Sequence, residues 1–467
     1  MNQVDFDTFS FIEQVNISIS PSPDTRHNLT QAMKTTIIEI LALSFGLLVG
    51  CSSGNATQQT SVDAIQYTGD TYSLDNIDFF SANDLCQKQK ENLVLTKEER
   101  YCADKVNDLA FTMLHQMATK QEDSSFVVSP VSLSCAIAIA GNGAAGKTLQ
   151  EIERLVGPIA NANSFYRKYH AALPHNDNSN CSILNFLAVN HKYPIKKAFT
   201  NNIATQYDAS VKSIDFANPQ SVKQINEWFH QQLNDESVDV VIEPNRETAL
   251  LLAGVLDFRA FWSSPFDSKL TDNDDFTTDR GDTLQIPMMY QENAFLYTEN
   301  NSFQAVSLPY LGNCYRMLLV LPKSEKLSRF SSSMNTNAFL NILGSLKEED
   351  LVRLILPRFG CVADIDVKEM LAKFIPRAFD AKKANFSAIC ALPTWIDEIS
   401  HKTSIEVTEQ GTKARSITVE SFMVKAAAPE FYATHPFLFF VYDDVTHAIM
   451  LMGQFCGDGA IYAEEDK

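Results

Sequence analysis

The chain has 467 residues, of which 45% are hydrophobic and 20% are charged, a composition typical of globular protein with a large core. Its 57 acidic and 38 basic residues give a formal net charge of −19. Such a surface repels nucleic acid and heparin-like polyanions, so we expect no nucleic-acid partner, and it favours encounters with basic proteins.

The N-terminal part of the chain carries a targeting pattern rather than a fold. Residues 1–32 are polar and lack periodicity, and we interpret them as a non-native extension from a misassigned start codon, because Met33 begins a segment of different character. The apolar run 40–50 is too short to cross a bilayer, yet it fits the apolar region of a signal peptide over residues 33–50.

The end of that run, Leu48-Val49-Gly50-Cys51, resembles the lipobox of bacterial lipoproteins. The resemblance implies lipidation of Cys51 and contact with the membrane only through the lipid anchor. Ser52 favours the outer membrane or cell surface, so the expected location is the bacterial cell envelope, facing the periplasm or the exterior. Residues 51–95 are rich in small polar residues and are expected to form a flexible tether. For the apolar run 40–50, the alternatives to a lipoprotein signal are an ordinary secretory signal and a core helix.

The chain has nine cysteines and no CxxC pair or metal-ligand spacing. With Cys51 assigned to lipidation, eight remain that could pair in an oxidising periplasm, with a connectivity that sequence does not define. Cys86 and Cys102 flank the start of the folded domain and form the first pair to test. Cys135 lies in an apolar helical pattern and is expected to be a buried thiol.

Residues 96–460 are expected to form one α+β domain, followed by an acidic tail at 461–467. Helical periodicity covers 98–120, and Ser129-Pro130 is a helix start. Thr148 and Glu151 have the spacing of a capping box. Strand patterns occupy residues 125–129, 183–190, 249–258, 284–289, 305–308, 317–322 and 351–356, and further helical patterns occupy 221–235 and 367–374.

Residues 141–148 match the phosphate-binding pattern GxxxxGK[ST]. In a nucleotide hydrolase, Lys147 would reach the phosphates and Thr148 would hold Mg²⁺. The helix-initiating Ser129-Pro130 upstream argues against the strand that such a loop needs, so this interpretation is a remote alternative. The sequence contains no HExxH or GxSxG motif, and we expect neither an enzyme nor a cofactor or metal site.

The most informative segment runs from Glu409 to Phe440. Short residues alternate with larger ones over Thr412, Ala414, Ser416 and Thr418, as in a strand with one buried face. Gly411 opens this segment, and we find no turn signal that folds it back onto a neighbour. A segment that could be a strand but lies in a loop suggests a stored conformational change.

This segment resembles the reactive-centre loop of the serpins, and the resemblance extends over nearly the whole domain. The fold it implies has a large central mixed β-sheet, two smaller sheets, eight to nine helices and an exposed loop at about 409–430. In their order and spacing the matching segments are specific: Phe126–Ser132, Phe258–Trp262, Ile286–Met289, Leu308–Tyr310, Leu356–Phe359, Asn385–Ser387, His401 and His435–Phe437.

The resemblance implies a monomeric inhibitor of serine proteases that acts by suicide. The protease cuts the loop, is trapped as an acyl-enzyme, and is carried along as the cut loop enters the central sheet as a strand. The hinge would comprise Glu409, Gly411, Thr412, Ala414 and Ser416. Counting from the hinge glutamate places the bait bond between Lys425 and Ala426, which suits a trypsin-like protease.

Alternatives remain at the bait bond and in the mechanism. The apolar run before Lys425 also suits plasmin-like or cysteine proteases, and a shift that places Val424 before the bond would suit elastase-like enzymes. Lys413, Arg415 and Ile417 depart from the family pattern at positions expected to face solvent. Glu420 falls in the inward register, where an unpaired carboxylate is costly. Arg415 and Glu420 therefore support a non-inhibitory member that acts as a substrate or binding module.

The resemblance also implies two regions where the sheet must open. A shutter beneath the sheet would contain Ser129, Ser132, Asn226 and His401, whose polar groups need partners both before and after the strands separate. The breach, where the hinge first enters, would contain Trp262. His401, taken alone, and Trp262 each have a simpler interpretation as part of the core.

Overall fold

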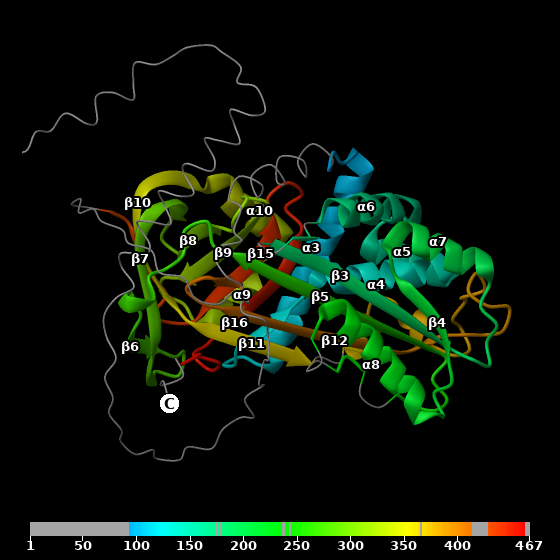
Figure 1. Cartoon of the computed structure of the whole chain (residues 1–467). Coiled ribbons are helices and arrows are strands. Elements are labelled where there is room, and N and C mark those ends of the chain that lie inside the picture. Colours follow the sequence, from blue (N-terminus) through cyan, green and yellow to red (C-terminus); the bar gives the residue numbers. More distant parts are fainter. Residues whose placement is uncertain are drawn as a thin grey trace, which may run out of the picture. The chain divides into compact units, whose positions relative to one another are not determined.

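The computed structural model describes residues 93–173, 175–176, 179–235, 239–241, 244–364, 367–412 and 428–462. Over these residues the chain forms two β-sheets and nine α-helices (Figure 1). The predicted α+β class and the large mixed sheet are confirmed. The two smaller sheets that were expected are hydrogen-bonded into one array.

The first sheet has seven strands and positions the site. Its order is β11-β12-β13-β5-β3-β2, with β4 on the outer side of β3. The β5–β12 and β3–β4 pairs are parallel and the other pairs are antiparallel. The strands are β2 (His175–Asn176), β3 (Ser179–Asn190), β4 (Ser210–Ile214), β5 (Leu250–Phe261), β11 (Phe359–Asp364), β12 (Ile396–Val407) and β13 (Gly411–Thr412).

The second sheet has nine strands in the order β1-β16-β15-β9-β8-β7-β10-β14, with β6 also paired to β7. The long strand β7 joins its two parts, because it pairs with β6 and β10 along much of its length and with β8 near its end. The strands are β1 (Phe126–Val128), β6 (Asp272–Thr277), β7 (Thr283–Glu299), β8 (Phe303–Pro309), β9 (Tyr315–Pro322), β10 (Lys347–Pro357), β14 (Glu430–Tyr432), β15 (Phe437–Asp443) and β16 (Ile449–Phe455).

Two helices cover opposite faces of the seven-stranded sheet. Helix α4 is apolar on all sides and is buried against β3, β5 and β16 as part of the main core. Helix α8 packs an apolar stripe on the other face, in a separate core that includes Phe186 of β3 and Ala253 of β5. The helices are α3 (Lys97–Lys120), α4 (Pro130–Gly143), α5 (Gly146–Val156), α6 (Ile159–Ala172), α7 (Lys197–Tyr207), α8 (Pro219–Leu233), α9 (Leu327–Ser333), α10 (Thr336–Ser345) and α11 (Val367–Leu371).

Of two helix starts predicted from local sequence, one is confirmed and one is wrong. Helix α4 begins at Pro130 as expected, and the side chain of Ser129 caps it by accepting from the amide of Ser132. The capping box predicted at Thr148 and Glu151 is wrong, because α5 begins earlier, at Gly146, with Ala145 at its cap. Thr148 lies inside the helix, and its hydroxyl accepts a hydrogen bond from the amide of Asn385 instead.

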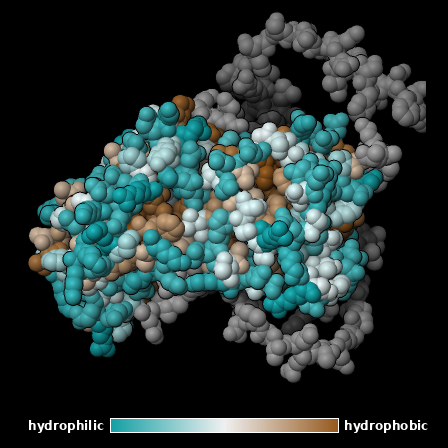
Figure 2. All heavy atoms as spheres, turned by 180° about the vertical axis from the view of Figure 1, so that it is seen from behind, coloured by the Kyte–Doolittle hydropathy of each residue, from teal (hydrophilic) through white to brown (hydrophobic). Residues whose placement is uncertain are grey.

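The face of the molecule that Figure 2 shows is largely hydrophilic. In Figure 2 charged and polar residues cover most of the face shown, with apolar patches between them. No helix in the described part of the chain combines the length and the apolar character needed to cross a membrane.

Candidate functional site: the gap between strands β5 and β12

Strands β5 and β12 are paired at one end only. Their parallel ladder runs from the pair Ile396 and Leu250 to the pair His401 and Gly254. At the other end the short strand β13 lies between them, with Thr412 opposite both Val407 of β12 and Ala260 of β5. Beyond this ladder, the sheet therefore has a gap between β5 and β12 with room for one further strand. Strand β13 occupies the entrance of this gap.

A tight turn places β13 in this position. The amide of Thr408 donates to the carbonyl oxygen of Gly411 at 2.9 Å, and the amide of Gly411 donates back to that of Thr408 at 3.3 Å. Thr408 to Gly411 is thus the turn of a hairpin between β12 and β13. The expectation that no turn folds this segment onto a neighbour is wrong, because backbone bonds close the turn without a strong sequence signal.

Gly411 is the residue that allows this close approach. Its φ of +151° lies in a range that side chains disfavour. A Cβ atom at this position would overlap the carbonyl oxygen of Ala260 and lie 2.7 Å from the Cα of Phe261. Any other residue would therefore push the hinge out of the gap.

Two stacked aromatic rings contact the hinge residues at the entrance of the gap. Trp262 stacks on Tyr310 with ring centroids 4.4 Å apart and planes at 12°. The indole Nε1 of Trp262 donates to the carbonyl oxygen of Thr408 at 2.9 Å, and its amide donates to that of Gln410 at 2.8 Å. The hydroxyls of Tyr310 and Thr412 are hydrogen-bonded at 2.6 Å, and the side chain of Thr412 is fully buried. Trp262 therefore contacts the hinge directly.

The turn is also held by a buried ion pair. Glu409 lies between the guanidinium of Arg358, whose Nε is 3.1 Å from Oε2, and the hydroxyl of Thr271, which is 2.7 Å from Oε1. Burial opposes ionisation of Glu409, but the hydrogen bonds from Arg358 and Thr271 outweigh it and hold the pKa of the carboxyl below its usual range. The hinge glutamate is thus charged and anchored.

His401 belongs to the last residue pair of the β5–β12 ladder, and its side chain is fully buried. Its Nε2 accepts from the amide of Ser129 at 3.2 Å and lies 3.2 Å from the hydroxyl of Thr403. Burial lowers the pKa of His401 to about 4, so the ring is neutral near pH 7. Because Nε2 accepts the hydrogen bond from the backbone amide of Ser129, the proton of the neutral imidazole ring lies on Nδ1.

Asn226 lies outside this group, which corrects the prediction for it. It belongs to α8, on the opposite face of the sheet, and its amide bonds to the backbone of Val240 and Val241. The amide beneath the sheet comes instead from Asn185 of β3, which sequence reasoning missed. A Cβ on Gly254 would lie 3.0 Å from the hydroxyl oxygen of Ser132 and 3.1 Å from Oδ1 of Asn185.

Two polar atoms at this place lack a hydrogen-bond partner within the described structure, namely Ser132 Oγ and Asn185 Oδ1. The Nδ2 of Asn185 donates to the sulfur of Cys135 at 3.3 Å. A glycine in the centre of a buried strand, with polar neighbours, signals close side-chain approach. That glycine was the sequence signal that could have located Asn185.

Comparison with known proteins accounts for this arrangement. Residues 104–457 match the family described as Serpin (serine protease inhibitor). The chain belongs to the serpin family. An uncharacterized serpin-like protein of Thermococcus kodakarensis is 30% identical over 379 residues, which cover 78% of this chain and 88% of the relative. Human glia-derived nexin is 27% identical over 73% of this chain and 90% of its own length.

Solved structures agree with the fold of this serpin. The native state of tengpin, a thermophilic serpin, superposes with a TM-score of 0.70 at 25% identity and covers 78% of this chain and 95% of its own. Human thyroxine-binding globulin bound to its hormone reaches a TM-score of 0.71 at 22% identity, over 76% of this chain and 98% of its own. The second similarity shows the fold alone.

Several predicted site residues of this serpin fall outside the described part of the chain. These are the bait residues Lys425 and Ala426, the hinge residues Ala414 and Ser416, and the lipidation site Cys51. The described cysteines form no disulfide with one another, and Cys135 is buried as expected. Cys102 is buried, while its proposed partner Cys86 lies outside the described residues.

The segment that matches the phosphate-binding pattern is a helix junction in this serpin. Gly141 and Gly143 end helix α4, whereas a phosphate-binding loop follows a strand. A Cβ at Gly141 would overlap Ile159, and one at Gly143 would overlap Ile389, so both glycines are needed for packing. Thr148 is buried and bonded to Asn385. The geometry leaves no cradle for phosphate.

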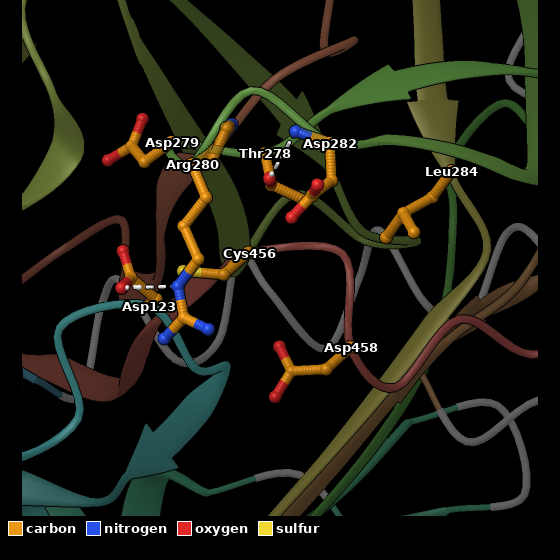
Figure 3. A pocket seen from close by; sticks show the side chains of 9 residues that line it. Asp123, Thr278, Asp279, Arg280, Asp282, Leu284, Cys456 and Asp458 are labelled. Carbon is orange, nitrogen blue, oxygen red and sulfur yellow. Dashed lines mark hydrogen bonds and ion pairs between the residues drawn. The ribbon is translucent and has the colours of Figure 1, made fainter.

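A separate acidic pocket lies beside the second sheet (Figure 3). Arg280 is paired with Asp123, with Nε 2.8 Å from Oδ2, and Asp279, Asp282 and Asp458 also line the pocket. Across the described residues, no group of three or more His, Cys, Asp or Glu side chains is placed to hold a metal ion. The pocket does not touch the gap between β5 and β12 through any lining residue.

Proposed function

We propose that this serpin inhibits serine proteases by loop cleavage and insertion, with Lys425–Ala426 as the bait bond. The observation that carries the proposal is the position of β13, whose residues Gly411 and Thr412 pair with both β5 and β12. The hinge already lies at the start of the path that an inserted loop follows. Lys425 suits the acidic primary pocket of a trypsin-like enzyme.

The register supports the same mechanism. Thr412 is buried towards the main core, so in a continued strand the alternate positions Ala414, Ser416 and Thr418 take the same face. These side chains are short enough for a packed interior. Lys413, Arg415 and Ile417 take the other face, where bulk is tolerated more easily.

The test is to mix the domain without its first 52 residues with trypsin and to analyse the products on denaturing gels. We expect a band at the summed mass that survives SDS, together with a released peptide that begins at Ala426. Lys425→Glu should abolish the band, whereas Lys413→Glu, which keeps the bait residue, should retain it. Cleavage at Lys425 without a stable band would show a substrate and not an inhibitor.

The second candidate is a non-inhibitory serpin that acts as a substrate or binding module. Glu420 favours it, because continuation of the β13 register buries this carboxylate. The variant Glu420→Ala distinguishes an inhibitory serpin limited by Glu420 from this second candidate. If Glu420 limits insertion, this variant should form more SDS-stable complex than the wild type.

We further propose that the protein is a monomer held at the bacterial cell envelope by a lipid on Cys51. The support is the Leu48-Val49-Gly50-Cys51 sequence and the polar tether that follows. Expression in a bacterial host should place the full chain in the membrane fraction, and Cys51→Ala should release it. Inhibition should be unchanged by this release, because Cys51 belongs neither to the hinge nor to the bait bond.

A further inference from the structure

The described fold has a basic end, although the chain as a whole is acidic. Segment 382–389 joins the starts of helices α5 and α7 there. The carbonyl oxygen of Asn385 accepts from the amide of Ala145, the cap of α5, at 2.9 Å, and the carbonyl oxygen of Ser387 accepts from Nζ of Lys196, the cap of α7, at 2.6 Å. Exposed basic residues gather on these three segments: Lys147, Lys196, Lys197, Lys382 and Lys383.

Acidic residues offset only part of this charge. The ion pairs at this end are neutral as units: Lys383 with Asp380, Arg377 with Glu151 and Lys192 with Glu247. Among the described residues, Lys147, Lys197 and Lys382 form no ion pair. The end of the fold where α5 and α7 begin therefore carries a local positive surplus.

This basic end is far from the hinge. Strand β12 begins at Ile396, a few residues after the basic segment, and ends at Val407 beside β13, so its 12 residues separate the two ends by about 40 Å. Figure 1 shows α5 and α7 at one end of the described fold and β6 and β10 at the other. Exposed acids lie at that opposite end, on β6: Asp272, Asp274 and Asp275. Because charges are screened over about 8 Å at physiological salt, the basic end can attract an anionic surface despite the acids elsewhere.

An exposed apolar segment lies beside the lysines. The side chain of Leu392 is 49% exposed, and its neighbours Ala391 and Pro393 are exposed as well. The carbonyl oxygen of Ile389, three residues before Leu392, accepts from the amide of Lys196 at 2.8 Å, which holds this segment at the basic end. Lysines around an exposed apolar side chain are typical of surfaces that bind anionic membranes, because the apolar group enters the headgroup region while the ammonium groups contact lipid phosphates.

The first helix of the described fold also starts near this end. Gly157 follows helix α5, and a Cβ on it would lie 2.8 Å from the sulfur of Cys102, in the first turns of α3. Helix α5 has 11 residues, so Lys147 at its other end is about 16 Å away. A chain anchored at Cys51 is thus joined to the fold on the side of the basic end.

We propose that the basic end, defined by Lys147, Lys196, Lys197, Lys382 and Leu392, binds an anionic lipid bilayer. The lysines contact the headgroup phosphates, and Leu392 enters the headgroup region. The hinge then faces away from the bilayer, where a protease can reach the loop. This contact extends the envelope location proposed above and adds to the lipid on Cys51, but it requires neither that lipid nor inhibition.

The test is co-sedimentation with lipid vesicles, using the protein without its first 52 residues, which keeps every residue that the structure describes. We expect binding at about 0.1 M salt to vesicles that contain phosphatidylglycerol, and none to pure phosphatidylcholine. Binding should be lost at about 1 M salt, where the screening length falls to about 3 Å. The triple variant Lys147→Gln, Lys197→Gln, Lys382→Gln should bind about 100-fold more weakly, because each lysine near an anionic surface contributes about fivefold.

A matched triple variant controls for net charge. Lys269→Gln, Lys326→Gln, Lys347→Gln removes the same charge from exposed lysines outside the basic end, at the starts of η2 (Ser268–Leu270), α9 and β10. This variant should bind vesicles like the wild type. Circular dichroism establishes that both triple variants are folded.

The apolar contact distinguishes a bilayer from a soluble polyanion, which has no apolar interior. Leu392→Ser should weaken vesicle binding about tenfold and should not change binding to inorganic polyphosphate. Leu270→Ser is the matched control, because Leu270 is 51% exposed but belongs to η2, beside the hinge. Its vesicle binding should equal that of the wild type.

Three results would overturn the proposal. These are no binding of the wild type to phosphatidylglycerol vesicles, equal binding of the wild type and the Lys147, Lys197, Lys382 variant, and unchanged vesicle binding of Leu392→Ser together with equally tight binding to polyphosphate. The last result would assign the basic end to a soluble polyanion.

The test is separable from the functions proposed above. Vesicle binding is measured without a protease, so the presence or absence of a trypsin complex does not affect it. Because the contact is salt-sensitive, a wash at high salt removes it, and fractionation of Cys51→Ala after that wash reports on the lipid anchor alone.

Discussion

Gly411 and Ala260 approach so closely that a single Cβ atom on the glycine would overlap the carbonyl oxygen of Ala260. This contact makes the entry of the hinge into the sheet dependent on one residue. The consequences of the contact can be measured separately from the identity of the target protease.

Substitution Gly411→Val should turn the protein into a substrate. The side chain would expel β13 from between β5 and β12, and so delay the first step of insertion. On denaturing gels with trypsin we expect cleaved product in place of the stable complex. Gly344→Ala is the control, because a Cβ at Gly344 meets no atom within 4 Å; an unchanged complex yield for Gly411→Val would contradict the role of this contact.

Trp262→Phe should loosen the hinge. The variant keeps an aromatic ring on Tyr310 but loses the hydrogen bond from Nε1 to Thr408, with a net cost of about 1 kcal/mol plus a term for the smaller ring. Urea unfolding should show the loss, and hydrogen exchange should increase at the amide of Thr408. Trp395→Phe, at the opposite end of β12, should leave that exchange rate unchanged.

Acid should destabilise the hinge through Glu409. The pKa of this carboxyl in the folded state lies below its unfolded value, so its contribution to stability is present above the unfolded pKa and is lost as pH falls through the folded pKa. The stability difference between wild type and Glu409→Gln should therefore begin to shrink as pH falls below the ordinary glutamate pKa of about 4.3, and it should be lost only below the lowered pKa of the folded state.

At pH 7 the Glu409→Gln variant should be less stable by about 3 kcal/mol, because Arg358 is left buried without its partner. Urea midpoints measured from pH 7 down to about pH 2 provide the measurement. Glu348→Gln, an exposed position, is the control. A constant difference across the pH range would show that the charge of Glu409 is unimportant.

His401 should produce a second pH dependence, at higher pH. Its pKa falls to about 4 in the fold, so the ring is neutral there and takes up a proton on unfolding below its ordinary value. Stability from this residue is fully present above about pH 6.5 and is lost as pH falls towards 4, by roughly 3 kcal/mol in total.

The variant His401→Gln should flatten the stability profile between pH 6.5 and 4, even if its stability at pH 7 is lower. A slope that persists in His401→Gln would assign this pH dependence to other groups.

The sequence predicted the fold well because its signals are local or have family-wide spacing. The helix cap at Ser129, the strand ending in Trp262 and the hinge spacing all lie within short stretches of chain. Long-range contacts were less accessible. Asn185 and Gly254 are 69 residues apart and become neighbours only through the β3–β5 pairing, where Asn185 is opposite Gly254.

The misplacement of Asn226 has the same origin. An asparagine on an amphipathic helix carries no sequence signal for the face of the sheet it joins, and its three bonds go to backbone atoms 14 and 15 residues away. The turn at Thr408–Gly411 was missed because backbone bonds and an ion pair to Arg358 close it, and not the residue types typical of turns.

The position of β13 also affects contacts between molecules. A sheet with an unfilled row of backbone groups can accept a strand from a second chain and so begin a linear aggregate. The hairpin that carries Thr412 keeps a strand of the same chain at the entrance, at an effective concentration that a neighbouring molecule cannot match. By occupying the entrance of the gap, the hinge strand β13 disfavours insertion of a strand from another molecule.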